Sequence, residues 1–124
     1  MTDRTSEWAA LAEAVSEGHL YLEIGTARKC AEHCSKHIAV LAELKDRAYA
    51  LGHIDGLGAF PSGIALAEKF SKKAVGGDYS MVQALTDHIA EVEAMRDVFL
   101  RIEAQYMAAD ESSAQALGAI GPDL

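Results

Sequence analysis

The amino-acid sequence predicts an all-α protein, in which two long helices form an antiparallel hairpin with two short helices packed on it as a small bundle. Half of the residues are hydrophobic and only two of the 124 are Pro, a composition typical of helical proteins. Apolar residues recur at helical spacing in four segments, which Gly-rich stretches separate. A chain of this length has room for one core. We therefore expect a single domain over residues 1–112 and a flexible tail over 113–124.

The first segment predicts a short helix over residues 5–17. Thr5 or Ser6 is the expected N-cap, since a hydroxyl there accepts a hydrogen bond from a free backbone N–H group. Apolar residues follow at helical spacing, and Gly18 is expected to end the helix. These apolar residues are Trp8, Leu11 and Val15.

The two long segments, residues 26–52 and 79–111, each carry a heptad seam, meaning apolar positions that alternate steps of three and four. Such a seam is typical of a long helix that lies along another helix. The first seam is Ala27, Cys30, Cys34, His37, Leu41, Leu44, Ala48 and Leu51. The second is Met81, Leu85, His88, Val92, Met95, Phe99, Ile102 and Tyr106.

A second short helix is expected over residues 62–75, between the two long ones. It follows the Gly- and Pro-rich turn "ALGHIDGLGAFPSG", and Ser62 is its expected N-cap. The stretch "VGGDYS" then breaks the helix, and Asp78 or Ser80 is the expected cap of the last long helix.

Charge supports pairing of the two long helices. Segment 26–52 has five basic and three acidic residues, whereas segment 79–111 has two basic and seven acidic ones. Opposite charges on exposed flanks favour packing only modestly, by tenths of a kcal/mol per pair. If Ala27 lies beside Tyr106, an antiparallel register places Cys34 beside Phe99, His37 beside Met95 and Leu44 beside His88.

The stretch "CAEHCSKH" contains two thiols and two imidazoles, namely Cys30, His33, Cys34 and His37. Four side chains along one straight helix cannot surround a single ion, and the facing helix offers only a thioether in the expected register. Buried Cys also behaves as a small hydrophobe. We therefore favour a structural role and expect no metal or other cofactor. The alternative is a cytoplasmic helical bundle that binds copper or zinc through Cys30, Cys34 and His37.

Several function classes are disfavoured by composition and motifs. The net charge of −8 argues against nucleic acid as a partner, and the apolar runs are too short for a membrane-spanning segment. The sequence contains no phosphate-binding loop, no Glu-x-x-His pair and no Ser-His-Asp arrangement. The N-terminal residues lack the pattern of a cleavable signal peptide. We expect a non-enzymatic protein that is made in the cytoplasm.

The stretch "YMAAD", from Tyr106 to Asp110, falls at the expected end of the last long helix. In this, and in the turn and short helix of "GLGAFPSGIALAEKF", the chain resembles the type VII (ESX) secretion substrates of actinobacteria. Those proteins are helical hairpins without signal peptides, and many carry Tyr-x-x-x-Asp/Glu after the second helix. Their best-known branch has Trp-x-Gly in the turn. Here the turn holds Gly56, Gly58, Phe60 and Gly63, so the resemblance is to a more distant relative.

This resemblance implies a protein that acts by pairing with a helical partner, as a homodimer or a heterodimer. It also implies export without a cleavable signal and contact with secretion machinery, in which Tyr106 and Asp110 serve for recognition. Residues four apart share one face of a helix, so the ring and the carboxylate would make one compact patch. The alternative is a plain dimeric helical adaptor, in which Tyr106 closes the seam and Asp110 is a solvated acid.

Overall fold

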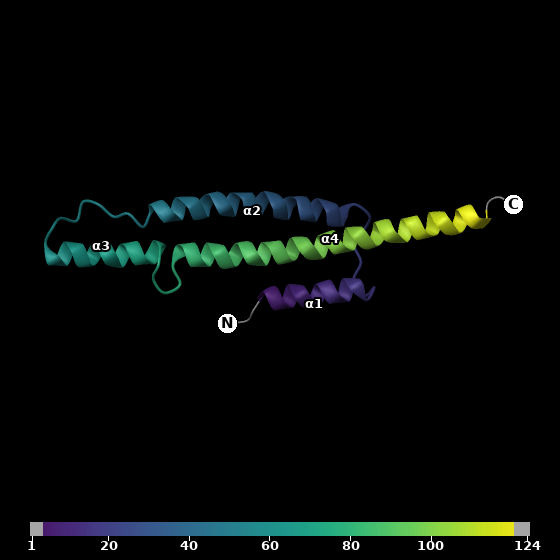
Figure 1. Ribbon diagram of the computed structural model, residues 1–124, viewed down its shortest axis with the longest axis horizontal. Helices are drawn as coiled ribbons and strands as arrows, with labels where there is room; N and C mark the ends of the chain where they lie inside the picture. Colours follow the sequence, from purple (N-terminus) through teal and green to yellow (C-terminus); the bar gives the residue numbers. More distant parts are fainter. Residues whose placement is uncertain (1–3, 121–124) are drawn as a thin grey trace. The chain divides into compact units, whose positions relative to one another are not determined.

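The computed structural model describes residues 4–120, and side chains from Ser6 to Ile120. Within this range the only regular secondary structure is helix, with no strand, and loops connect the helices (Figure 1). The helices are α1 (Arg4–Ser16), α2 (Thr26–Ala50), α3 (Pro61–Ala74) and α4 (Met81–Ile120). The all-α prediction and the existence of four helices are therefore confirmed.

The chain packs as two compact units. Among the described residues, one unit is built from 4–35 together with 93–120, and the other from Lys36–Val92. The long helices α2 and α4 each contribute residues to both units. The prediction of a single domain over 1–112 stays a prediction.

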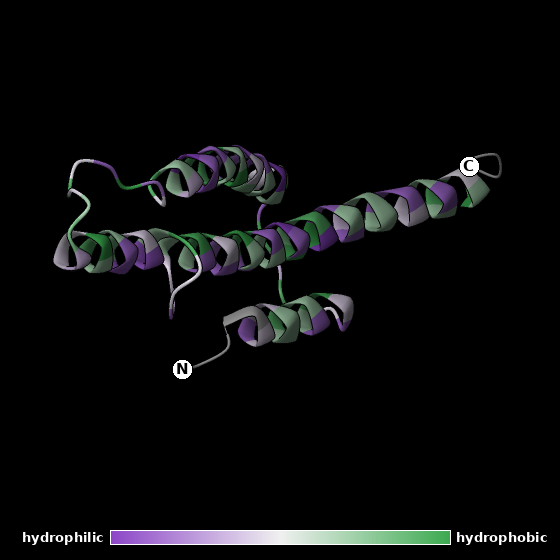
Figure 2. Ribbon diagram, turned by 60° about the vertical axis from the view of Figure 1, so that its left-hand side comes forward, coloured by the Kyte–Doolittle hydropathy of each residue, from purple (hydrophilic) through white to green (hydrophobic). Residues whose placement is uncertain are grey.

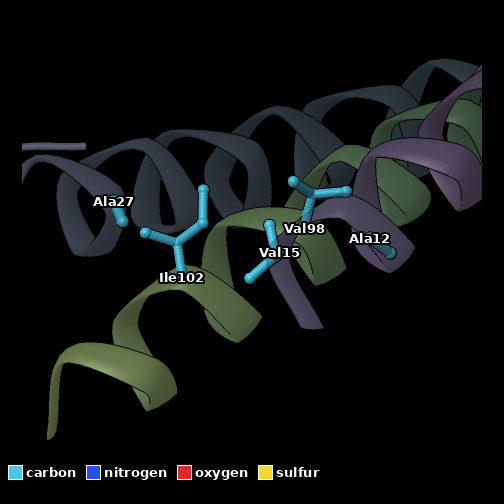
Figure 3. Close-up of a cluster of buried hydrophobic side chains, with 5 residues drawn as sticks. All are labelled: Ala12, Val15, Ala27, Val98 and Ile102. Atoms are coloured by element: carbon cyan, nitrogen blue, oxygen red, sulfur yellow. The ribbon is translucent and has the colours of Figure 1, made fainter. Parts of the chain in front are cut away.

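The first unit has a small core of aliphatic side chains from three helices. Val15 of α1 is fully buried, and Val98 and Ile102 of α4 are 2% and 3% exposed. Ala12 of α1 and Ala27 of α2 complete the cluster (Figure 3). Partly buried side chains surround it, namely Trp8, Leu20, Leu22, Phe99 and Tyr106. Burial of this apolar surface is the main stabilising contribution in the unit.

Helix α1 ends where the sequence predicts. Gly18 has a φ of +78°, which glycine adopts without the steric cost that a Cβ would bring. The Gly18 N–H group donates to the Val15 carbonyl at 3.0 Å, and the His19 N–H group donates to the Ala14 carbonyl at 2.8 Å. This pair of bonds is a Schellman motif, which satisfies carbonyl groups that the helix leaves free. The expected cap was wrong, because α1 begins at Arg4 and both Thr5 and Ser6 lie inside it.

The second unit combines the later part of α2, all of α3 and the start of α4. Leu41, Ala48, Ala74 and Val92 are its buried apolar residues. A Cβ on Gly52 would lie 3.0 Å from Val75 Cγ2, so the chain after α2 packs closely against the end of α3. This close approach favours a residue without a side chain at position 52, two residues after the end of α2.

The cap of α3 differs from the prediction. Phe60, not Ser62, is the N-cap, and it makes no side-chain capping bond. Pro61 occupies the first helical position, where its missing N–H group costs nothing and its fixed φ already suits a helix. Proline therefore starts this helix in place of a hydroxyl cap.

Helix α4 extends further than expected. The prediction ended it at residue 111, whereas it continues to Ile120. The added turns consist largely of Ala, Gln and Leu, which favour helix, and they contain a single Gly. The prediction gave too much weight to the polar residues Ser112 and Ser113. The part of the expected tail over 121–124 lies outside the described residues.

Ser80 is the N-cap of α4, one of the two residues expected for that role. The Gln83 N–H group donates to Ser80 Oγ at 3.3 Å, and Ser80 is 4% exposed. We expect Ser80→Ala to lower the free energy of unfolding by about 1 kcal/mol, because a buried helix end loses its acceptor. Urea unfolding followed by circular dichroism measures this.

Ser62→Ala is the matched control for this prediction. Ser62 is exposed in the first turn of α3 and does not cap that helix. Its replacement should change the free energy of unfolding by less than about 0.5 kcal/mol. Equal losses for Ser80→Ala and Ser62→Ala would contradict the capping role of Ser80.

Candidate functional site

Tyr106 and Asp110 lie one turn apart on α4, within the first unit. The Tyr106 ring is partly buried and packs against the core cluster of that unit. Asp110 is exposed. Packing of the ring fixes the position of this turn of α4, while the carboxylate remains accessible to water or to a partner.

The turns of α4 beyond Tyr106 are exposed at every residue from Met107 to Ile120. Apolar side chains are included, since Met107 is 65% exposed and Leu117 is 70% exposed. Figure 2 shows hydrophobic and hydrophilic residues interspersed along these turns. From Ile102 to the end of α4 the acidic residues are Glu103, Asp110 and Glu111, and there is no Lys or Arg.

The residues of "CAEHCSKH" are dispersed between buried and exposed positions. Cys34 is buried, Cys30 is partly exposed, and His33 and His37 are exposed. Burial raises the pKa of the Cys34 thiol, the neighbouring Cys30 adds to this effect, and the Arg96 guanidinium opposes it. A raised thiol pKa leaves less of the thiolate, which is the form that binds soft metals and reacts as a nucleophile.

The described residues contain no group of three or more His, Cys, Asp or Glu side chains placed to hold a metal ion. The alternative site of Cys30, Cys34 and His37 is therefore not assembled as a three-ligand cluster in this part of the chain. The buried position of Cys34 agrees with the packing role that we expected for a seam cysteine.

His37 has a neighbour that the sequence analysis did not give it. Its ring lies against that of His88, with centroids 5.8 Å apart and planes at 90°. The expected register put His37 beside Met95 and was wrong at this point, because His37 meets His88, which precedes Met95 by seven residues. A heptad repeat looks the same after a shift of seven residues, so the seam pattern alone cannot exclude such a shift.

Comparisons of the chain with protein-family models, with curated proteins and with solved structures each find no match. The resemblance to type VII secretion substrates therefore rests on the residues themselves. Within residues 4–120, no helix combines the length and the apolar character needed to cross a membrane.

Proposed function

We propose that this chain is a non-enzymatic, type VII secretion-associated protein that acts by pairing through helices with itself or with a helical partner. In this proposal Tyr106 and Asp110 form the recognition patch, and the chain is exported without a cleavable signal. The observation that carries the pairing part of the proposal is the exposed C-terminal part of α4, and the export part rests on the motif of Tyr106 and Asp110.

Residues 107–120 form about four turns of helix without a buried side chain. Isolated helices of about this length are marginally stable in water, because tertiary packing supplies most helix stability in proteins. A helix that lies against Met107, Leu117 and Ile120 would bury their exposed apolar surface. Partner binding thus accounts for both the helicity and the exposure of this segment.

Exposure elsewhere supports the same proposal. Among the described residues, more large apolar side chains are exposed than buried. Val40 and Leu44 of α2 are 52% and 42% exposed, although both lie on a helix rich in seam residues. Val40 and Leu44 lie one turn apart on the same face of α2, and contiguous exposed apolar surface is a mark of association sites.

The antiparallel hairpin belongs to this proposal, and contacts inside the first unit support it. Ala27 of α2 shares a cluster with Ile102 of α4. In the same unit, the Arg96 guanidinium of α4 lies near enough to the Cys34 thiol of α2 to act on its pKa. As residue numbers rise along α2 within this unit, those of the neighbouring residues fall along α4, which is the property of an antiparallel pair.

A plain dimeric helical adaptor is the second candidate, and the exposed apolar residues of α2 and α4 favour it equally. The two candidates differ in export and in the role of Asp110. In the adaptor, Asp110 is a solvated acid without a partner, so its replacement has no functional effect.

We expect Asp110→Ala to reduce export from the native host by about tenfold. The reason is that loss of one charge-assisted hydrogen bond, of about 1.4 kcal/mol, weakens binding to the secretion machinery by about that factor. Asp110 is exposed and outside the core, so folding should be unchanged. The measurement is the ratio of the protein in the culture medium to that in cells, by immunoblot. The double variant Tyr106→Ala, Asp110→Ala should abolish export.

Two further variants separate recognition from stability. Tyr106→Phe keeps the packing of the ring against the core and tests the hydroxyl group alone. The control is Tyr49→Ala with Asp46→Ala, an exposed tyrosine and acid on α2 that should leave export unchanged. Unchanged export in both Asp110→Ala and the Tyr106, Asp110 double variant would refute the recognition role.

A further inference from the structure

The contact between His37 and His88 brings together two metal-binding side chains from different helices of the second unit. His37 comes from α2 and His88 from α4, 51 residues apart in the sequence, and both are exposed. Neither residue belongs to the core of that unit. Their proximity is therefore a surface feature, open to ions from solution.

The separation of the rings suits the binding of one ion by both. Zn²⁺ binds imidazole nitrogen at about 2.0–2.1 Å, and the ring centre lies about 1 Å further on, so two rings on one tetrahedral ion have centres roughly 5 Å apart. The observed centroid distance is 5.8 Å. The difference is below about 1 Å, which is small enough for rotation of two exposed imidazole rings about their side-chain bonds to close it.

We propose that His37 and His88 form a two-imidazole binding site for a divalent transition-metal ion, with Zn²⁺ as the expected occupant. Imidazole is a preferred ligand of zinc, copper and nickel, and a net charge of −8 favours the approach of cations. Water completes the coordination, because the described residues add no third ligand to the pair. The site shares His37 with the cysteine-containing set that the sequence suggested, but it replaces both thiols by the His88 imidazole, and it does not depend on the proposed function.

A bound ion would join α2 to α4 within the second unit. Because the unfolded chain does not hold the two imidazoles together, binding favours the folded state and raises Tm as the ion concentration rises. Zn²⁺ binding at this site therefore has two separate readouts, the heat of binding and the thermal shift.

The test is calorimetric titration of the purified full chain with ZnCl2, together with Tm measured with and without Zn²⁺. We expect one equivalent to bind the unmodified protein and to raise Tm. His37→Ala and His88→Ala should each weaken Zn²⁺ binding by at least about tenfold. Loss of a residue that only hydrogen-bonds to a metal ligand already weakens binding by about that factor. Each variant should also reduce the thermal shift at a given Zn²⁺ concentration.

His53→Ala is the matched control. The His53 side chain is 80% exposed, and its Nε2 lies 3.0 Å from Asp55 Oδ2, so it is an accessible imidazole with an oxygen neighbour of its own. The control should keep both Zn²⁺ binding and the thermal shift. The proposal is overturned if the unmodified protein binds no Zn²⁺, if only one of the two site variants loses binding, or if His53→Ala loses it equally.

Discussion

Replacement of Ile102 by Ala is expected to lower the free energy of unfolding by about 3 kcal/mol, the largest loss that we expect from one truncation. Ile102 is 3% exposed and belongs to the cluster that joins α1, α2 and α4. Truncation removes buried methyl and methylene groups and leaves a cavity that rigid helices fill only in part. Urea unfolding followed by circular dichroism gives the value, and Tm should fall by roughly 10 °C or more.

Leu100→Ala is the control for this effect, since Leu100 lies two residues away on the same helix and is 49% exposed. Leu100→Ala should lower the free energy of unfolding by less than about 1 kcal/mol, because the Leu100 side chain stays in contact with water in the folded protein. If Ile102→Ala proves too unstable to measure, Ile102→Val should lose about 1 kcal/mol. Equal losses for Ile102→Ala and Leu100→Ala would contradict the placement of the core.

Gly63→Ala is expected to destabilise the protein by about 2 kcal/mol, although Ala is the better helix former. A Cβ on Gly63 would overlap the carbonyl oxygen of Leu57 and lie 3.0 Å from the Leu57 carbonyl carbon. Since both groups are backbone, relief requires the turn before α3 to shift, and such overpacking typically costs 1–3 kcal/mol, about 2 here. Chemical denaturation measures the change.

Gly118→Ala tests the same substitution where the structure leaves space. Gly118 lies in α4, and a Cβ there would meet no atom within 4 Å. Stability should increase by up to about 1 kcal/mol, because Ala costs less conformational entropy in a helix. The opposite signs of the two substitutions are the diagnostic result. A gain in stability for Gly63→Ala would show that Leu57 does not approach α3 as described.

Local signals in the sequence were sufficient to locate the helices. Apolar spacing predicted all four, Gly18 marked the end of α1, and Ser80 was one of two expected caps for α4. These features depend on residues within one or two turns of each other. Where two local signals competed, at Ser62 and Pro61, the prediction chose the hydroxyl cap and the structure starts the helix with proline.

Contacts between helices were predicted less well, for two physical reasons. A heptad seam permits registers that differ by seven residues, so the contact of His37 with His88 was not foreseen. A heptad seam also predicts a single neighbour for α4, whereas in the core of the first unit α4 packs with both α1 and α2. A second neighbour widens the buried face, which is why Val98, outside the expected seam, is among the most buried residues.

The candidate recognition residues were chosen from a short motif and from its place near a helix end. Packing gives them different environments, since Tyr106 is held against the core and Asp110 is exposed. The long exposed part of α4 beyond them was not predicted, because a polar and Gly-containing sequence resembles a tail. That segment is now the main reason to expect a helical partner.

The most direct test of the proposed function is a comparison of export in the native host with and without a working type VII secretion system. The measured quantity is the fraction of the protein in the medium, with a cytoplasmic marker as the control for lysis. We predict that the protein reaches the medium only when the system is intact, and that Asp110→Ala reduces this fraction. An equal fraction in both strains would contradict the proposed function and leave the plain helical adaptor.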